Sequence, residues 1–444
     1  MKTNAASAKP KLTTYEGGTA VVQRPLLELE RAVATCLLWE NTFYEKGSEI
    51  GERIADLCKQ VKAEDIAALA KKARTDWKLR HVPLWLLVQL LKKKWAGTKT
   101  VIAEVVQRPD EMGELLSLYW KDGKKPLAAQ LKKGLAAAFQ KFGFYALSKW
   151  DKDGPIKLRD VLFLCHAKPK DAEQDALWKK LINKELEAPD TWEVALSSGA
   201  DKKATWERLL KEKKLGDIAL LMNVRNMAEA KVDTTLVEAA ITEQAEKSKA
   251  LPFRYVSAAK AAPQYAACLS DAMLKAVSGK LLGSTAVVID VSGSMDATIS
   301  ARSELSRWEA AAALAILVRE IGDTVRVFTF STVLVEVANY RGLPLLDGVN
   351  RSQPHGATYL KAALAGIHNV WTPDRVIVIT DEQSHDGIYS AWTKYAYLIN
   401  VAPYKPGLDM SQGWHRISGW SERVVDWMQL QEQDNDEKEP TYVG

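Results

Sequence analysis

Residues 286–294, AVVIDVSGS, decide the fold of the C-terminal part of this 444-residue chain. Four apolar residues in a row are typical of a buried strand, and Asp290 marks the point where that strand ends. One carboxylate, from Asp290, and two hydroxyls, from Ser292 and Ser294, then follow at alternate positions. Hard divalent cations such as Mg²⁺ prefer oxygen ligands in an octahedral array and retain some waters, so these three side chains form a plausible partial shell.

Two further oxygen donors occupy positions of the same kind. Thr358 lies in a loop of small residues that opens an apolar helix, and Asp381 comes directly after the predicted strand 375–380. We therefore predict a divalent cation, expected to be Mg²⁺, held by five side chains at strand ends or in adjoining loops: Asp290, Ser292, Ser294, Thr358 and Asp381. The alternative for the first stretch is an ordinary turn that caps the following helix.

Strands alternate with helices after Gly283. The expected strands are 285–291, 324–330, 333–339, 375–380 and 397–401, and the expected helices are 302–321, 359–370 and 421–430. This order predicts a Rossmann-like domain over residues 284–431, with a mostly parallel sheet, helices on both faces and a ligand crevice at the carboxyl ends of the strands. The predicted metal shell falls in that crevice. The acidic segment 432–444 is expected to be a disordered tail.

The N-terminal part has a different pattern. From about Leu26 to Ser278, apolar residues recur at intervals of three and four, which is the helical period. Breaks such as 121–126 and 151–155 carry the Gly and Pro that stop helices. Because short helix pairs stack into solenoids, residues 1–283 are predicted to be an α-helical, HEAT-like repeat. The fold class is thus multidomain, α followed by α/β.

Charge is distributed unevenly between the two parts. Residues 1–283 contain 48 Lys and Arg against 36 Asp and Glu, while residues 284–444 contain 13 against 20. The excess concentrates in residues 51–150, with 20 basic and 10 acidic side chains. Such a local excess is expected of a protein that binds a phosphate backbone, although lysines also commonly solvate helix faces.

Composition excludes several classes of protein. No apolar run approaches the roughly 20 residues of a membrane span, and the N-terminus lacks the apolar core of a secretion signal. The four cysteines are scattered, which indicates neither a disulfide framework nor a zinc site. We therefore expect a cytoplasmic protein with no membrane association. No phosphate loop, His-Glu-x-x-His or nucleophile elbow is present, so we predict that the chain is not an enzyme.

The order Asp-x-Ser-x-Ser, then Thr, then Thr-Asp resembles the metal-ion-dependent adhesion site of von Willebrand factor A domains. Other stretches resemble the TROVE module of the Ro ribonucleoprotein family, and they are spread over nearly the whole chain: 38–44, 80–84, 132–142, 157–170 and 418–423. The resemblance implies helical repeats closed into a ring by the A domain. It also implies that small structured Y RNAs bind the basic outer face, while single-stranded ends of misfolded RNAs enter the hole.

The resemblance also suggests RNA-contacting residues. His166 matches the His of the family's His-x-Lys-Pro motif, with Lys168 and Lys170 beside it. Lys149 and Lys152 fall near the family's contacts for misfolded RNA, although Asp153 stands where another basic residue is expected. The next candidates lie at spacings that allow them to share one face of a predicted helix: Lys132, Lys133 and Lys141.

The leading hypothesis is a monomeric RNA-binding scaffold for a Y-like noncoding RNA and misfolded RNA, acting in RNA quality control or the stress response. An exoribonuclease or another protein is expected to bind through the A domain. The second hypothesis is a metal-dependent protein-interaction module without RNA as its main ligand. A third, a Mg²⁺-dependent nuclease acting through Asp381, has least support, because no general base or two-metal cluster is indicated.

Overall fold

The computed structural model describes residues 25–34, 47–197, 199, 201–248, 250–299, 303–401, 408, 413–419 and 422–436. The described residues form two compact units, one from Pro25 to Leu209 and the other from Leu210 onward. The sequence predicts a domain boundary at 283/284, where helices give way to strands. The compact units divide some 70 residues earlier in the chain, so the last helices of the helical part belong to the same unit as the sheet.

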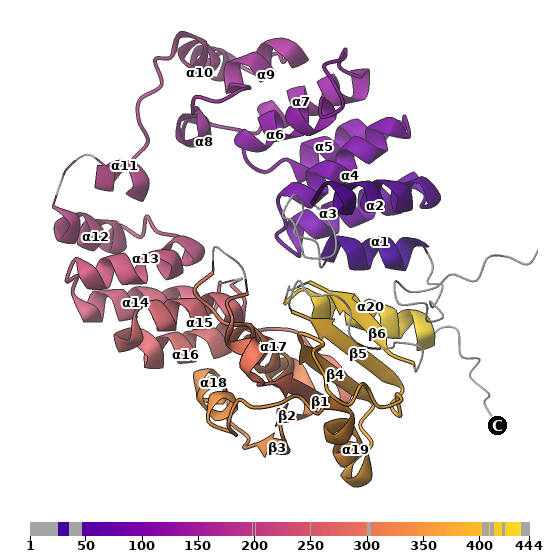
Figure 1. The fold of residues 1–444 in the computed structure, drawn as a ribbon. Helices are drawn as coiled ribbons and strands as arrows, with labels where there is room; N and C mark the ends of the chain where they lie inside the picture. Colours follow the sequence, from indigo (N-terminus) through magenta and orange to yellow (C-terminus); the bar gives the residue numbers. More distant parts are fainter. Residues whose placement is uncertain are drawn as a thin grey trace, which may run out of the picture. The chain divides into compact units, whose positions relative to one another are not determined.

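The first unit contains helices and no strand among its described residues, as the helical period predicts (Figure 1). Neighbouring helices pack in pairs, for example α3 on α4 and α5 on α7. Helix α12, Lys202–Lys211, spans the boundary between the units. The other helices of this unit are α1 Pro25–Ala34, α2 Gly47–Gln60, α3 Ala63–Thr75, α4 His81–Lys92, α5 Thr98–Val105, α6 Asp110–Tyr119, α7 Ala129–Phe139, α8 Phe144–Trp150, α9 Leu158–Cys165, α10 Ala172–Asn183 and α11 Trp192–Ser197.

Several helices end on a residue in the left-handed conformation that is not glycine. His166 ends α9 with a φ of 53°, and Lys184 ends α10 with a φ of 61°. Lysines follow the helix ends in the same conformation at positions 78, 94, 213 and 231. A basic side chain suits the negative end of the helix dipole, which partly offsets the backbone cost. Because lysine replaces the usual glycine, these helix ends are hard to read from the sequence.

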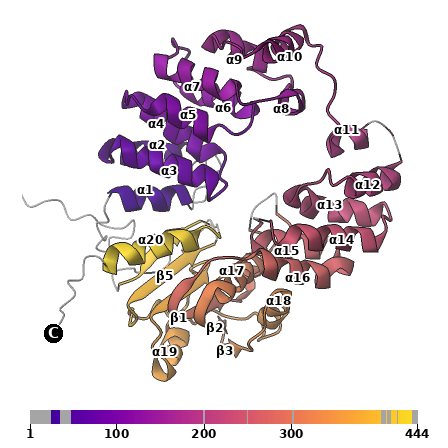
Figure 2. The same cartoon turned by 180° about the vertical axis from the view of Figure 1, so that it is seen from behind.

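The second unit begins with helices that precede the sheet, shown from both sides in Figures 1 and 2. Helix α15 packs against α17, the first long helix of the α/β part, and so ties these helices to the sheet. Glu422, far along the chain, accepts a hydrogen bond of 2.7 Å from the backbone N–H of Phe253 in the first turn of α15. The helices are α13 Asp217–Glu229, α14 Thr234–Ala245, α15 Pro252–Ala261, the short 3₁₀ helix η1 Pro263–Tyr265 and α16 Ala266–Ala276.

The sheet has six strands in the order β3-β2-β1-β4-β5-β6. All neighbouring strands are parallel except the β2–β3 pair, which confirms the predicted mostly parallel sheet. The bounds are β1 Leu281–Asp290, β2 Gly322–Phe330, β3 Leu334–Val337, β4 Arg375–Thr380, β5 Tyr395–Asn400 and β6 His415–Ser418. The sequence did not predict β6, nor helix α18, Leu343–Asn350.

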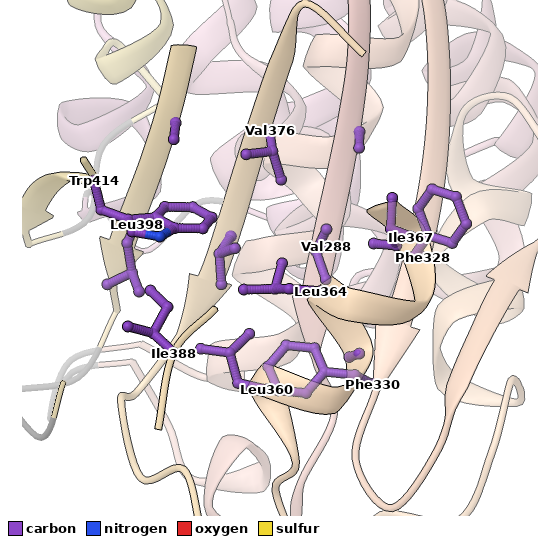
Figure 3. Packing of buried hydrophobic residues seen from close by; sticks show 14 of the residues in the cluster. Val288, Phe328, Phe330, Leu360, Leu364, Ile367, Val376, Ile388, Leu398 and Trp414 are labelled. Carbon is purple, nitrogen blue, oxygen red and sulfur yellow. The ribbon is translucent and has the colours of Figure 1, made fainter. Parts of the chain in front are cut away.

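Helices cover the sheet on both faces. On one face, α19, Leu360–Val370, packs its buried side chains onto residues of β1, β2, β4 and β5 (Figure 3). Val288 lies in this cluster with Leu364 and Val378, and Trp414 closes it beside β5 and β6. Side chains of a strand alternate between faces, so the next β1 residues point the other way, where α17, Arg307–Ile321, contacts β1 and β2.

Helix α20, Val424–Asp436, runs beyond the predicted end of the last helix at Leu430. The predicted tail from residue 432 is wrong at its start, because Glu432 is buried and its carboxylate forms an ion pair with Arg375 of β4. Tyr397 of β5 also donates a hydrogen bond of 3.2 Å to Glu432. The ion pair with the buried Arg375 thus stabilises Glu432 within α20. Residues 437–444 lie outside the described part of the chain.

No helix in the described part of the chain is long and apolar enough to cross a membrane.

Candidate metal centre and candidate nucleic-acid interface

The predicted metal ligands gather at the carboxyl edge of the sheet. Asp290 ends β1 and Asp381 directly follows β4, the parallel neighbour of β1. The backbone N–H of Gly293 approaches the carbonyl of Gly356 at 3.5 Å, which brings the loop before Thr358 against the Ser292–Ser294 turn. Both aspartates are fully buried, and Thr358 is nearly so. Adjacent parallel strands end side by side, so ligands more than 60 residues apart meet here.

Asp290 is held in place by two hydrogen bonds. Its Oδ1 accepts the backbone N–H of Ser292 at 2.9 Å, and its Oδ2 accepts the hydroxyl of Thr380 at 2.6 Å. Burial raises the pKa of Asp290 to about 6, against the opposing effect of these bonds. A buried carboxylate of this kind is costly without a counter-charge, and a bound cation would supply one.

The two serine hydroxyls are spaced as ligands of one ion would be. Ser292 Oγ and Ser294 Oγ lie 3.3 Å apart. Adjacent ligands in an octahedron with metal–oxygen bonds of about 2.1 Å lie about 3 Å apart, so the pair fits a small hard cation after a slight adjustment. Among the described residues, no group of three or more His, Cys, Asp or Glu side chains is arranged to hold a metal ion, and the donor set here is two carboxylates and three hydroxyls. This set suits Mg²⁺ better than zinc.

Arg307, which the sequence did not single out, reaches into the same site from the first turn of α17. Its Nη1 lies 3.2 Å from Asp381 Oδ2 and donates to the Ser294 carbonyl at 3.0 Å. Its side chain is only 7% exposed. A cation in the first helical turn opposes the helix dipole, and this mismatch directly after the Ser306 cap is the signal that could have drawn attention to it.

Histidines and aromatic residues border the metal ligands. His385 accepts the backbone N–H of Thr358 at 3.3 Å, and its ring lies 5.6 Å from that of Tyr359. On the other side, His355 pairs with Asp296 at 2.9 Å and meets the Trp308 ring edge-on at 6.2 Å. Imidazole and aromatic rings thus lie beside Thr358 and beside Asp296, which comes two residues after Ser294.

The helical unit contains the predicted RNA-contacting segment. His166 is the left-handed residue that ends α9, and its imidazole is exposed, as are Lys168 and Lys170. Two glutamines fix the backbone of this segment. Gln140 donates to the Lys168 carbonyl at 2.8 Å, and Gln174 accepts the Lys170 N–H at 3.1 Å while donating to the Gln140 carbonyl at 2.9 Å.

Phe163 stands beside this segment and was missed in the sequence. It is 58% exposed on the last turn of α9, three residues before His166. His166 follows the end of the helix, and its backbone N–H donates to the Phe163 carbonyl at 3.3 Å, so an exposed aromatic ring and an exposed imidazole come from the same helix end. A single exposed aromatic residue is unremarkable in a sequence, and only its exposure marks it out.

The remaining predicted RNA contacts fall into two groups. Lys132 and Lys133 lie on α7, but this helix ends at Phe139, so Lys141 does not share its face. The ammonium of Lys141 instead bonds to the carbonyls of Ala103 and Val106 at the end of α5, and its role as an RNA contact stays a prediction.

Lys149 and Lys152 both lie near the ring of Trp150, at 5.8 and 5.3 Å from its centroid. Lys149 also lies 3.6 Å from Glu193, and the guanidinium of Arg108 covers the Trp150 ring at 3.6 Å. Asp153 stands where the family has a basic residue. It pairs with Lys157 at 2.6 Å, so the two residues together add no net charge beside Lys149 and Lys152. Of these residues, Lys152 is the exposed cation.

Two family models match the chain. The TROVE domain matches residues 180–318, and the von Willebrand factor type A domain matches residues 285–383. The two matches overlap at the start of the sheet, and they agree with the two families that the sequence motifs resemble. The TROVE match begins after Lys170, so the roles carried over to His166, Lys168 and Lys170 stay predictions.

Among solved structures, the crystal structure of the Ro (RSR) protein of Deinococcus radiodurans is similar over 94% of both chains, with 15% identity and a TM-score of 0.57. The two proteins share a fold. An aerotolerance-related membrane protein of Bacteroides fragilis aligns over 26% of this chain and 66% of its own, with 19% identity and a TM-score of 0.20. No curated protein sequence matches the chain.

Proposed function

We propose that this chain is a non-catalytic RNA-binding scaffold similar to Ro. It binds a small structured, Y-like noncoding RNA on the basic surface of its helical unit and accepts single-stranded ends of misfolded RNA, as part of cytoplasmic RNA quality control or a stress response. The TROVE match and the fold shared with a Ro protein support an RNA ligand. The observation that carries the proposal is the exposed 166–170 segment held by Gln140 and Gln174.

The chemistry of this segment suits RNA. Lys168 and Lys170 supply point charges for phosphates, and an exposed His166 can hydrogen-bond a phosphate or a base. Because the backbone of both lysines is fixed by side-chain hydrogen bonds, less conformational entropy is lost when RNA binds. The exposed ring of Phe163 offers a stacking surface for an unpaired base, which favours structured RNA with loops or bulges over a blunt duplex.

The test is RNA binding across a salt series with the variant Lys168→Ala/Lys170→Ala. Each lost phosphate contact should reduce the slope of log K against log salt by about 0.7 to 0.9, so the double variant should lose about 1.5. Lys202→Ala/Lys211→Ala removes the same charge from exposed positions of α12 and is the matched control. Equal losses in both variants would refute a site at 166–170, and binding insensitive to salt would refute the RNA proposal.

Phe163→Ala separates stacking from charge in the same experiment. Loss of one stacked base should weaken binding to a stem-loop RNA by about 1–3 kcal/mol without changing the salt slope. Affinity for a blunt duplex should not change. A uniform loss on both RNAs would instead indicate that Phe163 supports the fold of α9.

A second candidate function is metal-dependent capture of a protein partner, such as an exoribonuclease. The paired Ser292 and Ser294 hydroxyls and the two buried aspartates support it. Asp290, Ser292, Ser294, Thr358 and Asp381 would hold the cation, whose open position would accept a carboxylate from the partner. Asp290→Ala should then abolish partner capture from a lysate and leave RNA affinity unchanged, whereas an RNA defect would refute the division of roles.

A further inference from the structure

We propose that Arg307 is an internal competitor of the divalent cation: in the metal-free protein its guanidinium holds Asp381, and cation binding must displace or repel it. The inference rests on the metal site of the second proposed function. It makes that site one of low affinity, whose occupation is coupled to the first turn of α17.

The contacts of Arg307 place it among the predicted ligands. Nη1 lies 3.2 Å from Asp381 Oδ2 and 3.0 Å from the carbonyl oxygen of Ser294. Asp381 is fully buried, so its negative charge has high electrostatic weight in a site of low dielectric. A cation that binds Asp381 therefore replaces the guanidinium as its positive partner. Loss of the Arg307–Asp381 ion pair and repulsion by the guanidinium reduce the binding free energy of the cation.

The position of Arg307 is fixed by its backbone. Ser306 and Glu309 form a capping box at the start of α17, with bonds of 2.6 and 3.2 Å, and Lys260 pairs with Glu309 at 2.7 Å. The Arg307 N–H donates to the Ala297 carbonyl at 2.9 Å. The helix cannot move away without losing these contacts, so a bound cation and the guanidinium remain neighbours. Any response to a bound cation must therefore come from the Arg307 side chain.

Charge gives the direction of the effect. Asp290 and Asp381 together contribute two negative charges, which balance one divalent cation; Arg307 adds a positive charge to that balance. The guanidinium therefore adds positive charge to a loaded site. This charge weakens binding of the cation. It also favours an anionic group at the cation's open position, which capture of a partner's carboxylate requires.

The test is cation binding by the full chain, measured by titration calorimetry with MnCl₂ and by the shift in melting temperature. Arg307→Gln removes the charge but keeps an amide that can donate to the Ser294 carbonyl. We expect it to bind Mn²⁺ about tenfold more tightly than the wild type or better. Arg307→Lys keeps the charge and should stay within about threefold of the wild type. Should Arg307→Gln fail to fold, Arg307→Met is a second neutral variant of similar length.

Each outcome is decisive. Weaker or unchanged binding by the neutral variants would overturn the proposal and make Arg307 a residue that positions Asp381 for the metal, or a structural ion pair. A lower melting temperature alone, without a change in affinity, would count for the structural pair. Binding by Arg307→Gln but not by the wild type would support competition most strongly. If neither protein binds and Asp381→Asn changes nothing, the metal site itself is refuted.

Discussion

Glu422→Gln should stabilise the second unit, and the gain should grow with pH. Glu422 is 7% exposed, and its carboxylate accepts the Phe253 N–H at the start of α15. Burial raises its pKa from 4.5 to about 8, although the Phe253 N–H and the charges of Arg423 and Arg254 oppose the shift. Glutamine keeps the accepting oxygen and removes the ionisation.

The sign follows from the direction of the shift. The folded chain holds its proton to a higher pH than the unfolded chain, so the contribution to stability is full below pH 4.5 and is lost as pH rises toward about 8. Between pH 5 and pH 8 the wild type should lose about 3 kcal/mol through this one group. The variant should lose none of it. Above about pH 8 the Glu422 carboxylate is ionised in both the folded and the unfolded wild type, so the difference between the two proteins no longer grows with pH.

Thermal unfolding of both proteins between pH 5 and pH 8 tests this prediction. At about 2 °C or more per kcal/mol, the difference in melting temperature should widen by at least about 6 °C across the range. Glu246→Gln, the same change at an exposed position, is the control and should give a difference that does not depend on pH. A constant difference for Glu422→Gln would refute the reasoning, because it would mean that the buried carboxylate stays ionised throughout.

Two further changes test how helices end in this fold. Lys184→Gly should stabilise the first unit by about 0.5–1 kcal/mol in urea unfolding, because only glycine adopts a φ of 61° without strain. Lys180→Gly, within α10, should destabilise the unit by about 1 kcal/mol, and equal effects of the two changes would contradict the role of the backbone. Glu432→Ala should lower the unfolding free energy of the second unit by about 3–5 kcal/mol, because it leaves Arg375 buried without this partner. Gln433→Ala, at an exposed position, should cost little, and a small loss at Glu432 would contradict a structural role for the start of the acidic segment.

The sequence predicted most of the sheet because buried parallel strands are long apolar runs. Strand β4 matches its predicted bounds, and β1 starts only a few residues early. Strand β6 has four residues and begins with His415 and Arg416, so neither length nor pattern reveals it. Helix α18 contains Pro344 and Gly348, which in a sequence are typical of a loop. Tertiary packing decides both elements.

The metal site was predictable for a topological reason, and the contact of Arg307 with Asp381 was not. The ends of β1 and β4 must meet at one edge of the sheet, so a motif that names residues after each strand also places them together. Arg307 comes from a helix that crosses this edge, 74 residues before Asp381. No pattern in a single sequence connects these two positions, because the contact depends on where α17 lies against the sheet.

Some basic side chains of the helical unit form hydrogen bonds within the protein, which a count of charges does not reveal. Lys141 was counted as a phosphate contact, yet its ammonium is bonded to the two carbonyls at the end of α5, and burial lowers its pKa. Arg80 similarly pairs with Asp110 and Glu114. A basic side chain attracts RNA at long range whether or not it is paired within the protein. It can contact a phosphate only if its N–H donors are not already bonded to protein groups.

Those internal bonds also explain why the 166–170 segment is the better candidate. Its backbone groups are satisfied by glutamine side chains, which leaves the charged ends of Lys168 and Lys170 exposed. Lys141 has the opposite arrangement, because its ammonium bonds to backbone carbonyls at the end of α5. A phosphate-binding surface requires the first arrangement, in which neutral side chains hold the backbone and cations face solvent. The salt slope measures this distinction directly, since only cations that contact phosphate release counterions.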